Sequence, residues 1–388
     1  MRPAVLAVYV TAMCMNGLDA TIVNPALFRI AADLGVAPAA ANPVEWAFLA
    51  SVAAVMPVAG WLCDRYGAAR VFLVSLAVFT AGSGLCALAW DLGSLVGFRV
   101  VQGAGGGVLT PAGLAMLFAA VPPEERMRLS KYVVVPTALA PALGPVLGGW
   151  LADAFSWRWA FLVNLPLGAA AVVAGLVVLP LSGGTTVRLV LRELLPVRQL
   201  AADQAFLRGT AAAALAAAGL MGMLFVFPLM YQDLLGASAT EAGLVLFPEA
   251  LGLLAAGFLV ERSCARWGER RVIAVGLAGG AVLFALPALA DLGPWPLRLL
   301  MFAVGLVLGQ AVTAVQVTSF AGVGPELMGR AMTLFQSVRM LGGGLGVGLC
   351  ALAIGLGYRA ALLVSAALVA AALTARAGAH AVSETRHP

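Results

Sequence analysis

The chain has few charged residues for its length. Charged side chains make up 11% of its 388 residues, against roughly 25% in soluble proteins. Hydrophobic residues account for 62%, and the mean hydropathy is +1.00. This balance argues against a water-soluble fold and predicts a protein that crosses a membrane many times.

Histidine and cysteine are also scarce. The two histidines, His380 and His387, lie in the polar C-terminal tail, so no histidine-based metal site or triad is expected inside the membrane. The five cysteines show neither the spacing of metal ligands nor that of a disulfide framework. No phosphate-binding loop or nucleophile–base pair is visible either. We therefore expect no enzyme activity, no metal and no cofactor, and an ion gradient as the energy source. Protons are the expected ion, and Na⁺ is not excluded.

The apolar stretches predict about twelve membrane spans. Most basic residues fall in alternate connections, and the positive-inside rule then places both termini in the cytoplasm. We expect a multi-pass protein of the plasma membrane, with a first span that is not a cleaved signal peptide. The formal charge of +5 includes no basic block, so nucleic acid is not an expected partner. The predicted spans are roughly 4–27, 46–63, 70–90, 93–120, 132–152, 159–181, 207–233, 241–262, 270–290, 294–321, 331–354 and 358–376.

The spans form two groups of six. Residues 1–181 are expected to form an N-terminal bundle, 182–206 a cytoplasmic linker, and 207–388 a C-terminal bundle with a short cytoplasmic tail. The linker is predicted either to form a short interfacial helix or to be plain coil. Glycine clusters in both the fifth and the eleventh span suggest an internal repeat. The expected fold class is an all-α integral membrane protein made of two pseudo-symmetric six-helix bundles.

A charged turn joins the second and third spans. It contains Gly60, Asp64, Arg65, Gly67 and Arg70, and its glycines allow two helix ends to approach closely. The acid and the arginines can pair across the turn. This run resembles the signature loop between helices 2 and 3 of the major facilitator superfamily. The resemblance implies an alternating-access transporter of that fold, in which these residues form a cytoplasmic gate.

Ionisable residues also occur inside the predicted spans. Asp19 lies in the first span, Arg99 in the fourth and Glu249 in the eighth. A charged side chain at the bilayer centre costs about 3 kcal/mol or more, so each is a candidate functional residue. Either acid can carry a proton or compensate a cationic substrate. The structural alternatives are a hydrogen-bonding acid near a helix end at Asp19, an arginine satisfied by neighbouring backbone, and a protonated Glu249 bonded to a neighbouring helix.

The sequences around these residues resemble one branch of the superfamily. Leu18-Asp19-Ala-Thr-Ile-Val-Asn24 resembles the first helix of the drug:proton antiporters that usually have fourteen helices. Arg99-Val-Val-Gln102-Gly103 resembles the helix-4 motif linked to proton coupling. The resemblance implies that Asp19, Arg99 and Gln102 take part in proton coupling.

A glycine–proline cluster lies in the fifth span. It contains Pro141, Gly144, Pro145, Gly148 and Gly149, which predict a hinge or a tightly packed helix. The run also resembles the antiporter motif associated with exporters, and this resemblance implies outward transport.

The resemblance extends over nearly the whole chain and implies a specific function. We expect a proton-coupled antiporter that exports small amphipathic or cationic compounds, such as drugs or antibiotics, and we favour a monomer. The segment 182–206 is too short for the two extra helices of the branch, so a twelve-helix form is expected. A symporter or specific metabolite transporter of the same fold is the first alternative. A non-transporting receptor or assembly partner is the second, and the intramembrane charges argue against it.

Overall fold

The computed structural model describes residues 3–119, 140–179, 181, 200, 203–290, 292–324 and 327–377. Over these ranges the chain forms helices and no strand, which confirms the predicted all-α membrane fold. Within these described ranges, eleven helical stretches are long and apolar enough to cross a membrane. The remaining predicted span, 132–152, is described only from residue 140, where a helix runs to 154. Most of the predicted linker, 182–199, lies outside the described residues.

The chain divides into two compact units. The first comprises Met1–Leu194 with Ala237–Gly243, and the second comprises Leu195–Gly236 with Leu244–Pro388. The helices of the first unit are α1 (Pro3–Ile22), η1 (Asn24–Ala26), α2 (Leu27–Asp33), η2 (Pro38–Ala41), α3 (Pro43–Val55), η3 (Met56–Val58), α4 (Ala59–Tyr66), α5 (Ala68–Ala87), α6 (Leu92–Ala119), the helix 140–154, α8 (Trp159–Leu162) and α9 (Asn164–Val178). The later helices are α12 (Gln204–Leu235), α13 (Ala239–Trp267), α14 (Glu269–Leu289), α15 (Pro294–Ser319), α16 (Met328–Ile354) and α17 (Tyr358–Ala377).

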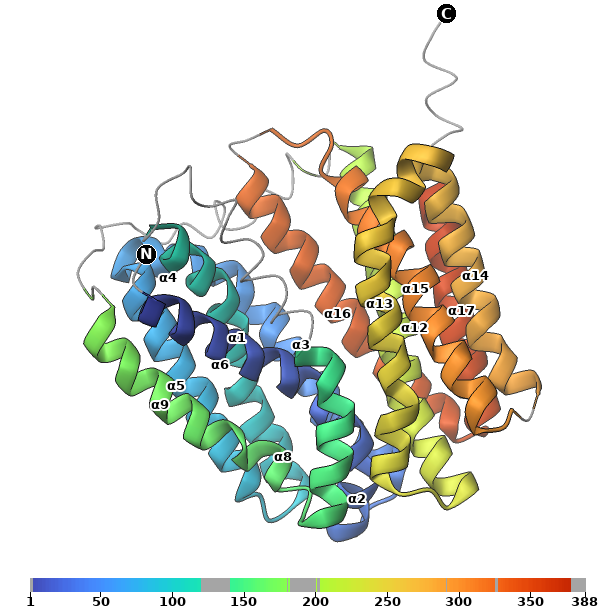
Figure 1. Cartoon of the computed structure of the whole chain (residues 1–388), viewed down its shortest axis with the longest axis horizontal. Helices are drawn as coiled ribbons and strands as arrows, with labels where there is room; N and C mark the ends of the chain where they lie inside the picture. Colours follow the sequence, from blue (N-terminus) through green and yellow to red (C-terminus); the bar gives the residue numbers. More distant parts are fainter. Residues whose placement is uncertain are drawn as a thin grey trace, which may run out of the picture. The chain divides into compact units, whose positions relative to one another are not determined.

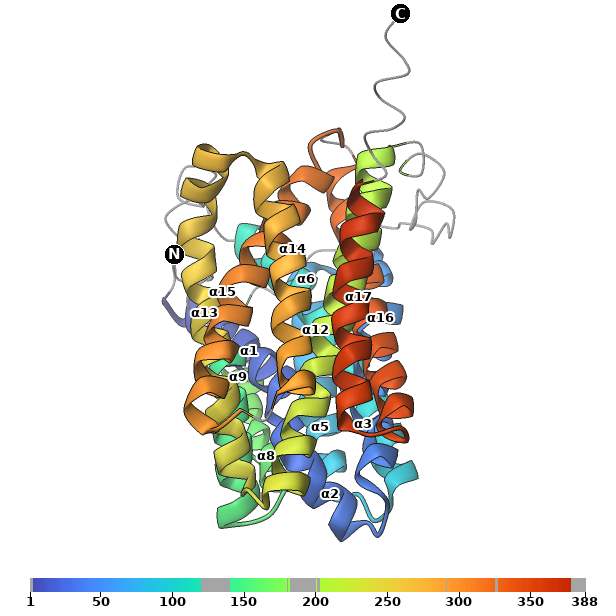
Figure 2. The same cartoon turned by 90° about the vertical axis from the view of Figure 1, so that its right-hand side faces the viewer.

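Each unit is built around a few extensive helix contacts. In the first unit α6 packs against α3 and α5, and α9 packs against α1 and α5, as Figure 1 shows. In the second unit α17 packs against α12 and α14, which Figure 2 shows side by side. The helix α16 has its most extensive contact with α12. Small residues dominate these surfaces, since close approach of backbones replaces the hydrophobic driving force that lipid does not supply.

Prolines explain two differences between predicted and observed spans. The first span continues beyond residue 27: Pro25 lies in a short 3₁₀ turn, Asn24–Ala26, and the helix then resumes from Leu27 to Asp33. The second span does not begin at 46, because Asn42 is the N-cap and Pro43 opens α3 in the first turn, where proline is tolerated. As a result, Glu45 lies inside a helix and not in the preceding loop.

The two units repeat the same turn. Gly67 joins α4 to α5 with φ 85° and ψ 132°, and Gly268 joins α13 to α14 with φ 80° and ψ 146°. Each glycine donates its N–H to the carbonyl of a cysteine four residues earlier, Cys63 or Cys264, at 2.9 Å. A positive φ strains any residue with a Cβ, so both turns require glycine.

The two units also repeat a packing contact. Gly144 and Gly148 place their backbone against the carbonyls of Leu18 and Ile22 in α1. In the second unit, Gly342 and Gly346 of α16 meet the carbonyls of Ala214 and Ala218 in α12, with the same four-residue spacing on both sides. The glycine clusters of the fifth and eleventh spans are therefore matched contact surfaces on the first helix of each unit.

The contact at Gly148 gives a prediction about stability. In Gly148→Ala the new methyl group would meet the carbonyl oxygen of Ile22, and overpacking of this kind costs about 1–3 kcal/mol. We expect the apparent Tm of the purified protein in detergent to fall by several degrees. Gly257→Ala is the matched control, because no atom lies within 4 Å of its new methyl group. Equal Tm values for the two variants would contradict the packing role.

Candidate functional site

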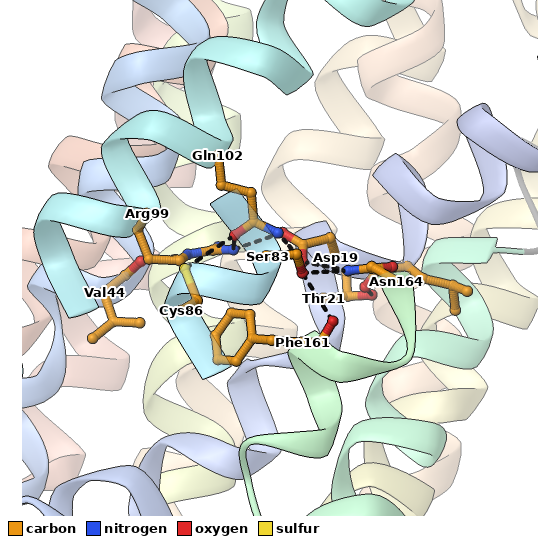
Figure 3. Close-up of polar contacts among 10 residues, drawn as sticks. Asp19, Thr21, Val44, Ser83, Cys86, Arg99, Gln102, Phe161 and Asn164 are labelled. Carbon is orange, nitrogen blue, oxygen red and sulfur yellow. Dashed lines mark hydrogen bonds and ion pairs between the residues drawn. The ribbon is translucent and has the colours of Figure 1, made fainter. Parts of the chain in front are cut away.

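The first unit holds a buried network centred on Asp19 of α1. The Asp19 side chain is fully buried, and its Oδ2 accepts a hydrogen bond from Nη1 of Arg99 at 2.6 Å. Its Oδ1 accepts from Nε2 of Gln102 at 2.7 Å and from Nδ2 of Asn164 at 3.1 Å. Figure 3 shows these side chains converging from α1, α6 and α9. The structure thus brings together three residues that the sequence predicted as a set: Asp19, Arg99 and Gln102.

Arg99 is held on several sides at once. Its Nε donates to the carbonyl of Val44 at 3.0 Å, and Nη1 also donates to Oε1 of Gln102 at 2.9 Å. Its guanidinium lies 4.1 Å from the ring centre of Phe48 and 5.7 Å from that of Phe161. Arg99 is 1% exposed, so water does not screen its attraction to Asp19. The position of the guanidinium is therefore fixed by both charge and ring contacts.

Two members of the network were not found from the sequence. Asn164 begins α9 and donates from the same Nδ2 to Asp19 and to Oγ of Ser83, at 3.0 Å. Ser83 in turn donates to the carbonyl of Phe161 at 2.9 Å. Only the fold brings residues 19, 83 and 164 together.

The hydrogen bonds define the charge state of Asp19. All three partners of its carboxyl group are donors, and an ionised carboxylate is an acceptor only. The geometry therefore fits an ionised Asp19 paired with a charged Arg99.

The glycine–proline cluster positions α1 in this network. Thr21, two residues after Asp19, donates from Oγ1 to the carbonyl of Pro141 at 2.9 Å. The backbone at Gly144 and Gly148 lies against α1, and Gly149 lies against the carbonyl of Ala239 at the start of α13. Pro145 contributes its carbonyl to the close approach of Gly243. The cluster thus packs the helix 140–154 closely against α1 and against residues 239–243, all within the first unit.

The predicted gate residues lie at the α4–α5 turn. The Arg65 guanidinium lies 5.6 Å from the ring centre of Tyr66, and Arg70 donates to the carbonyl of Leu181 at 3.1 Å. Gly67 supplies the positive φ of the turn, and Asp64 lies in the last turn of α4, which ends at Tyr66. Gly60 has open space where a Cβ would lie, so it makes no close packing contact.

A carboxylate at the other end of the first unit fixes the start of α13. Asp153 accepts hydrogen bonds from N and Oγ1 of Thr240, both at 2.7 Å, and pairs with Arg29 at 3.2 Å. Burial acts to raise the pKa of Asp153, but the hydrogen bonds from Thr240, Ala239 and Arg29 outweigh it and hold the pKa below its usual range.

Glu249 is the predicted site residue that lies in the second unit. It follows Pro248 within α13, is 8% exposed, and has no hydrogen bond or ion pair to another described residue. Several further polar atoms in this unit are buried and unpartnered, namely Oγ1 of Thr210, Oε1 of Gln336, Oγ of Ser337 and Nε of Arg339. Unpartnered buried atoms also occur in the described part of the first unit, at both carboxylate oxygens of Glu45, Nε1 of Trp61 and Oδ1 of Asn164, so free hydrogen-bonding capacity is not confined to the second unit.

The second unit also contains a cavity of about 650 Å³. It lies among α12, α14, α15 and α17, and none of the predicted site residues lines it. Arg376 at its rim donates to Oγ1 of Thr318 at 2.7 Å. Among the described residues, no group of three or more histidine, cysteine or acidic side chains has the arrangement of a metal site.

One buried acid in the first unit was missed from the sequence. Glu45 is 3% exposed, and neither of its carboxylate oxygens has a hydrogen-bond partner. The sequence predicts the second span from residue 46 and so places this acid just outside the membrane. Pro43 is the sequence signal that would have placed the start of this helix before Glu45.

Comparison with known proteins agrees with this architecture. Residues 9–347 match the family described as the Major Facilitator Superfamily. The chain is 31% identical to a putative multidrug resistance protein MdtD of Serratia proteamaculans over 394 residues, covering 88% of this chain and 83% of that protein. It is 30% identical to a multidrug resistance protein B homolog of Mycobacterium tuberculosis over 402 residues, covering 88% and 74%.

Solved structures show the same fold at lower identity. A mutant of the nucleoside transporter NupG superposes with a TM-score of 0.78 at 13% identity, over 97% of this chain and 99% of that one. A bacterial homolog of the human lysosomal transporter Spinster superposes with a TM-score of 0.76 at 16% identity, over 100% and 98%. With its family match, its relatives and its helical membrane fold, the chain belongs to the major facilitator superfamily and is a membrane transporter, not an enzyme.

Proposed function

We propose that the protein is a proton-coupled antiporter that exports small amphipathic or cationic compounds across the plasma membrane. The observation that carries the proposal is the buried pair of Asp19 and Arg99, a titratable charge inside a membrane span of a transporter. The multidrug resistance relatives support the substrate class. The expected orientation has both termini in the cytoplasm.

The network around Asp19 supports proton coupling. With Asp19 ionised, its three hydrogen bonds join α1 to α6 and α9. With Asp19 protonated, one of its oxygens becomes a donor and the attraction to Arg99 is lost. The two protonation states thus favour different packing of the same helices, which is the requirement for coupling a proton to a conformational change. A proton gradient supplies about 1.4 kcal/mol per pH unit for each proton, enough for tenfold accumulation of substrate.

The second unit offers groups that suit substrate binding. An ionised Glu249 without an intramolecular partner would attract a cation, and the unpartnered atoms of Thr210, Gln336 and Arg339 can hydrogen-bond a polar group. The apolar helices around them suit the rest of an amphipathic molecule. The α4–α5 turn, with Asp64, Arg65 and Arg70, is proposed to act as the cytoplasmic gate.

The proposed direction of transport rests on the sequence of the helix 140–154, which resembles the motif associated with exporters. Its glycines and prolines pack closely against α1 and residues 239–243. The close packing supports a role for this helix in limiting leak during the cycle, and export is the direction that we propose.

Removing the titratable group at Asp19 tests the proposal directly. We expect Asp19→Asn to lower gradient-driven accumulation of ethidium in everted vesicles at least tenfold, because the amide cannot carry the coupling proton. Asp91→Asn is the matched control: Asp91 is exposed and accepts from the N–H of Ser94, which asparagine can also do. Undiminished accumulation in Asp19→Asn would contradict the proposal. An imposed Na⁺ gradient, applied in parallel, identifies the coupling ion.

The role of Glu249 gives a separate prediction. We expect Glu249→Gln to raise the KM for a lipophilic cation about tenfold, as expected for the loss of about 1.4 kcal/mol of attraction, with little change for a neutral amphipathic substrate. Glu261→Gln, on an exposed part of α13, is the control. Equal effects on both substrates, together with an altered pH profile, would instead identify Glu249 as a proton carrier. Unchanged transport and pH dependence would exclude both roles.

A further inference from the structure

Glu45 is a buried acid that forms no hydrogen bond with the described residues of the network around Asp19. It lies in the first turn of α3 and is 3% exposed, and neither Oε1 nor Oε2 has a hydrogen-bond partner. Asn24 of η1 lies beside its carboxyl group without giving either oxygen a hydrogen bond of good geometry. An ionised carboxylate that is buried without partners is costly, and such a group takes up a proton instead. Glu45 is therefore neutral in the described structure, in contrast to Asp19.

Arg99 contacts the residues on either side of Glu45. Its Nε donates to the carbonyl of Val44, the residue immediately before Glu45. Its guanidinium lies 4.1 Å from the ring centre of Phe48, one helical turn after Glu45 on the same face of α3. The positive charge of Arg99 is therefore near enough to attract an ionised Glu45, although it forms an ion pair with Asp19 only.

The charges of the three side chains explain why only one acid is ionised. Asp19 and Arg99 together carry no net charge. A second ionised acid would leave a net negative charge in a site that water does not reach, which is strongly unfavourable. The cluster can therefore hold one proton on either acid. The described structure is the arrangement in which Glu45 holds the proton and Arg99 pairs with Asp19.

The two acids lie at different depths. The connection between the first two spans runs from Asp33 to Pro38. At 1.5 Å per helical residue, Glu45 lies about 10 Å from that connection along its helix, and Asp19 lies about 21 Å from it. Glu45 is thus nearer to the surface on which the connection lies, which is the extracellular surface if both termini are cytoplasmic.

We propose that Glu45 is a second proton-binding site of this protein, which exchanges a proton with Asp19 through their shared neighbour Arg99. In this exchange the O–H bond of Glu45 breaks, Arg99 moves its charge to the new carboxylate, and the proton forms an O–H bond on Asp19. The charge of the cluster is the same before and after. Glu45 would receive protons from the extracellular side, and Asp19 would pass them on. This inference deepens the proposed antiport and rests on it for its direction, but the sharing of Arg99 can be tested without transport.

A double-mutant cycle tests the sharing of Arg99. We expect Asp19→Asn and Glu45→Gln each to change the apparent Tm only modestly, because the remaining acid can still compensate Arg99. The double variant leaves Arg99 buried without a counter-charge, so its Tm should fall by roughly 3 °C or more beyond the sum of the single changes. Additive changes would overturn the proposal. If the double variant does not fold, the pH dependence of the Tm of Asp19→Asn decides. Ionisation of Glu45 in this variant should make its Tm rise relative to that of the wild type as the pH increases through the neutral range, and an unchanged difference would overturn the sharing.

A transport measurement separates this inference from the proposed function. In everted vesicles, we expect Glu45→Gln to lower gradient-driven uptake of ethidium about tenfold while exchange of ethidium at equal pH on both sides is unchanged. Glu241→Gln is the control, since Glu241 is exposed and caps the N–H of Ser238. If ethidium uptake by the wild type does not depend on the proton gradient, the proposed antiport is contradicted. The double-mutant cycle would still test whether the two acids share Arg99. Gradient-driven uptake in Glu45→Gln equal to wild type would overturn the role of Glu45.

Discussion

The pairing of Asp19 with Arg99 is the interaction on which the first unit depends. It joins α1 to α6, and the other polar contacts of the site are arranged around it: Gln102 bridges the two charges, and Asn164 adds α9. The aromatic rings of Phe48 and Phe161 enclose the guanidinium and exclude water. The pair thus ties the packing of three helices to two opposite charges that are both buried.

The two units share their packing but not their charges. Gly148 lies on the carbonyl of Ile22 as Gly346 lies on that of Ala218, and Gly67 and Gly268 form the same turn. This register aligns Asp19 with Leu215, an apolar residue of α12. The backbone repeat therefore supplies two similar scaffolds, and the polar network is built on one of them.

The sequence predicted the fold class, because long apolar stretches separated by charged turns leave few alternatives in a membrane. It also marked Asp19, Arg99 and Glu249 as candidates, because charges inside apolar spans are costly without a task, and the resemblance to the drug:proton antiporters added Gln102. The partners Ser83 and Asn164 were not predictable, because ordinary polar residues near helix ends carry no signal until the chain is folded. Glu45 was missed for a different reason: a boundary error of a few residues at Pro43 moved a buried acid outside its helix. Rotation of each span about its axis, which decides what faces the network, is likewise set by packing and not by composition.

The Asp19–Arg99 pair also has an electrical consequence. An unpaired elementary charge that moves through a membrane potential gains or loses about 2.3 kcal/mol per 100 mV. The pair is neutral as a whole, so the helices that carry it can change position in the field without that work. If the transporter is an antiporter, its dependence on voltage would then be set by the charges of the substrate and of the coupling ion. Exchange of one proton for one monovalent cation would not depend on membrane voltage. Exchange of one proton for a neutral molecule would be driven by it.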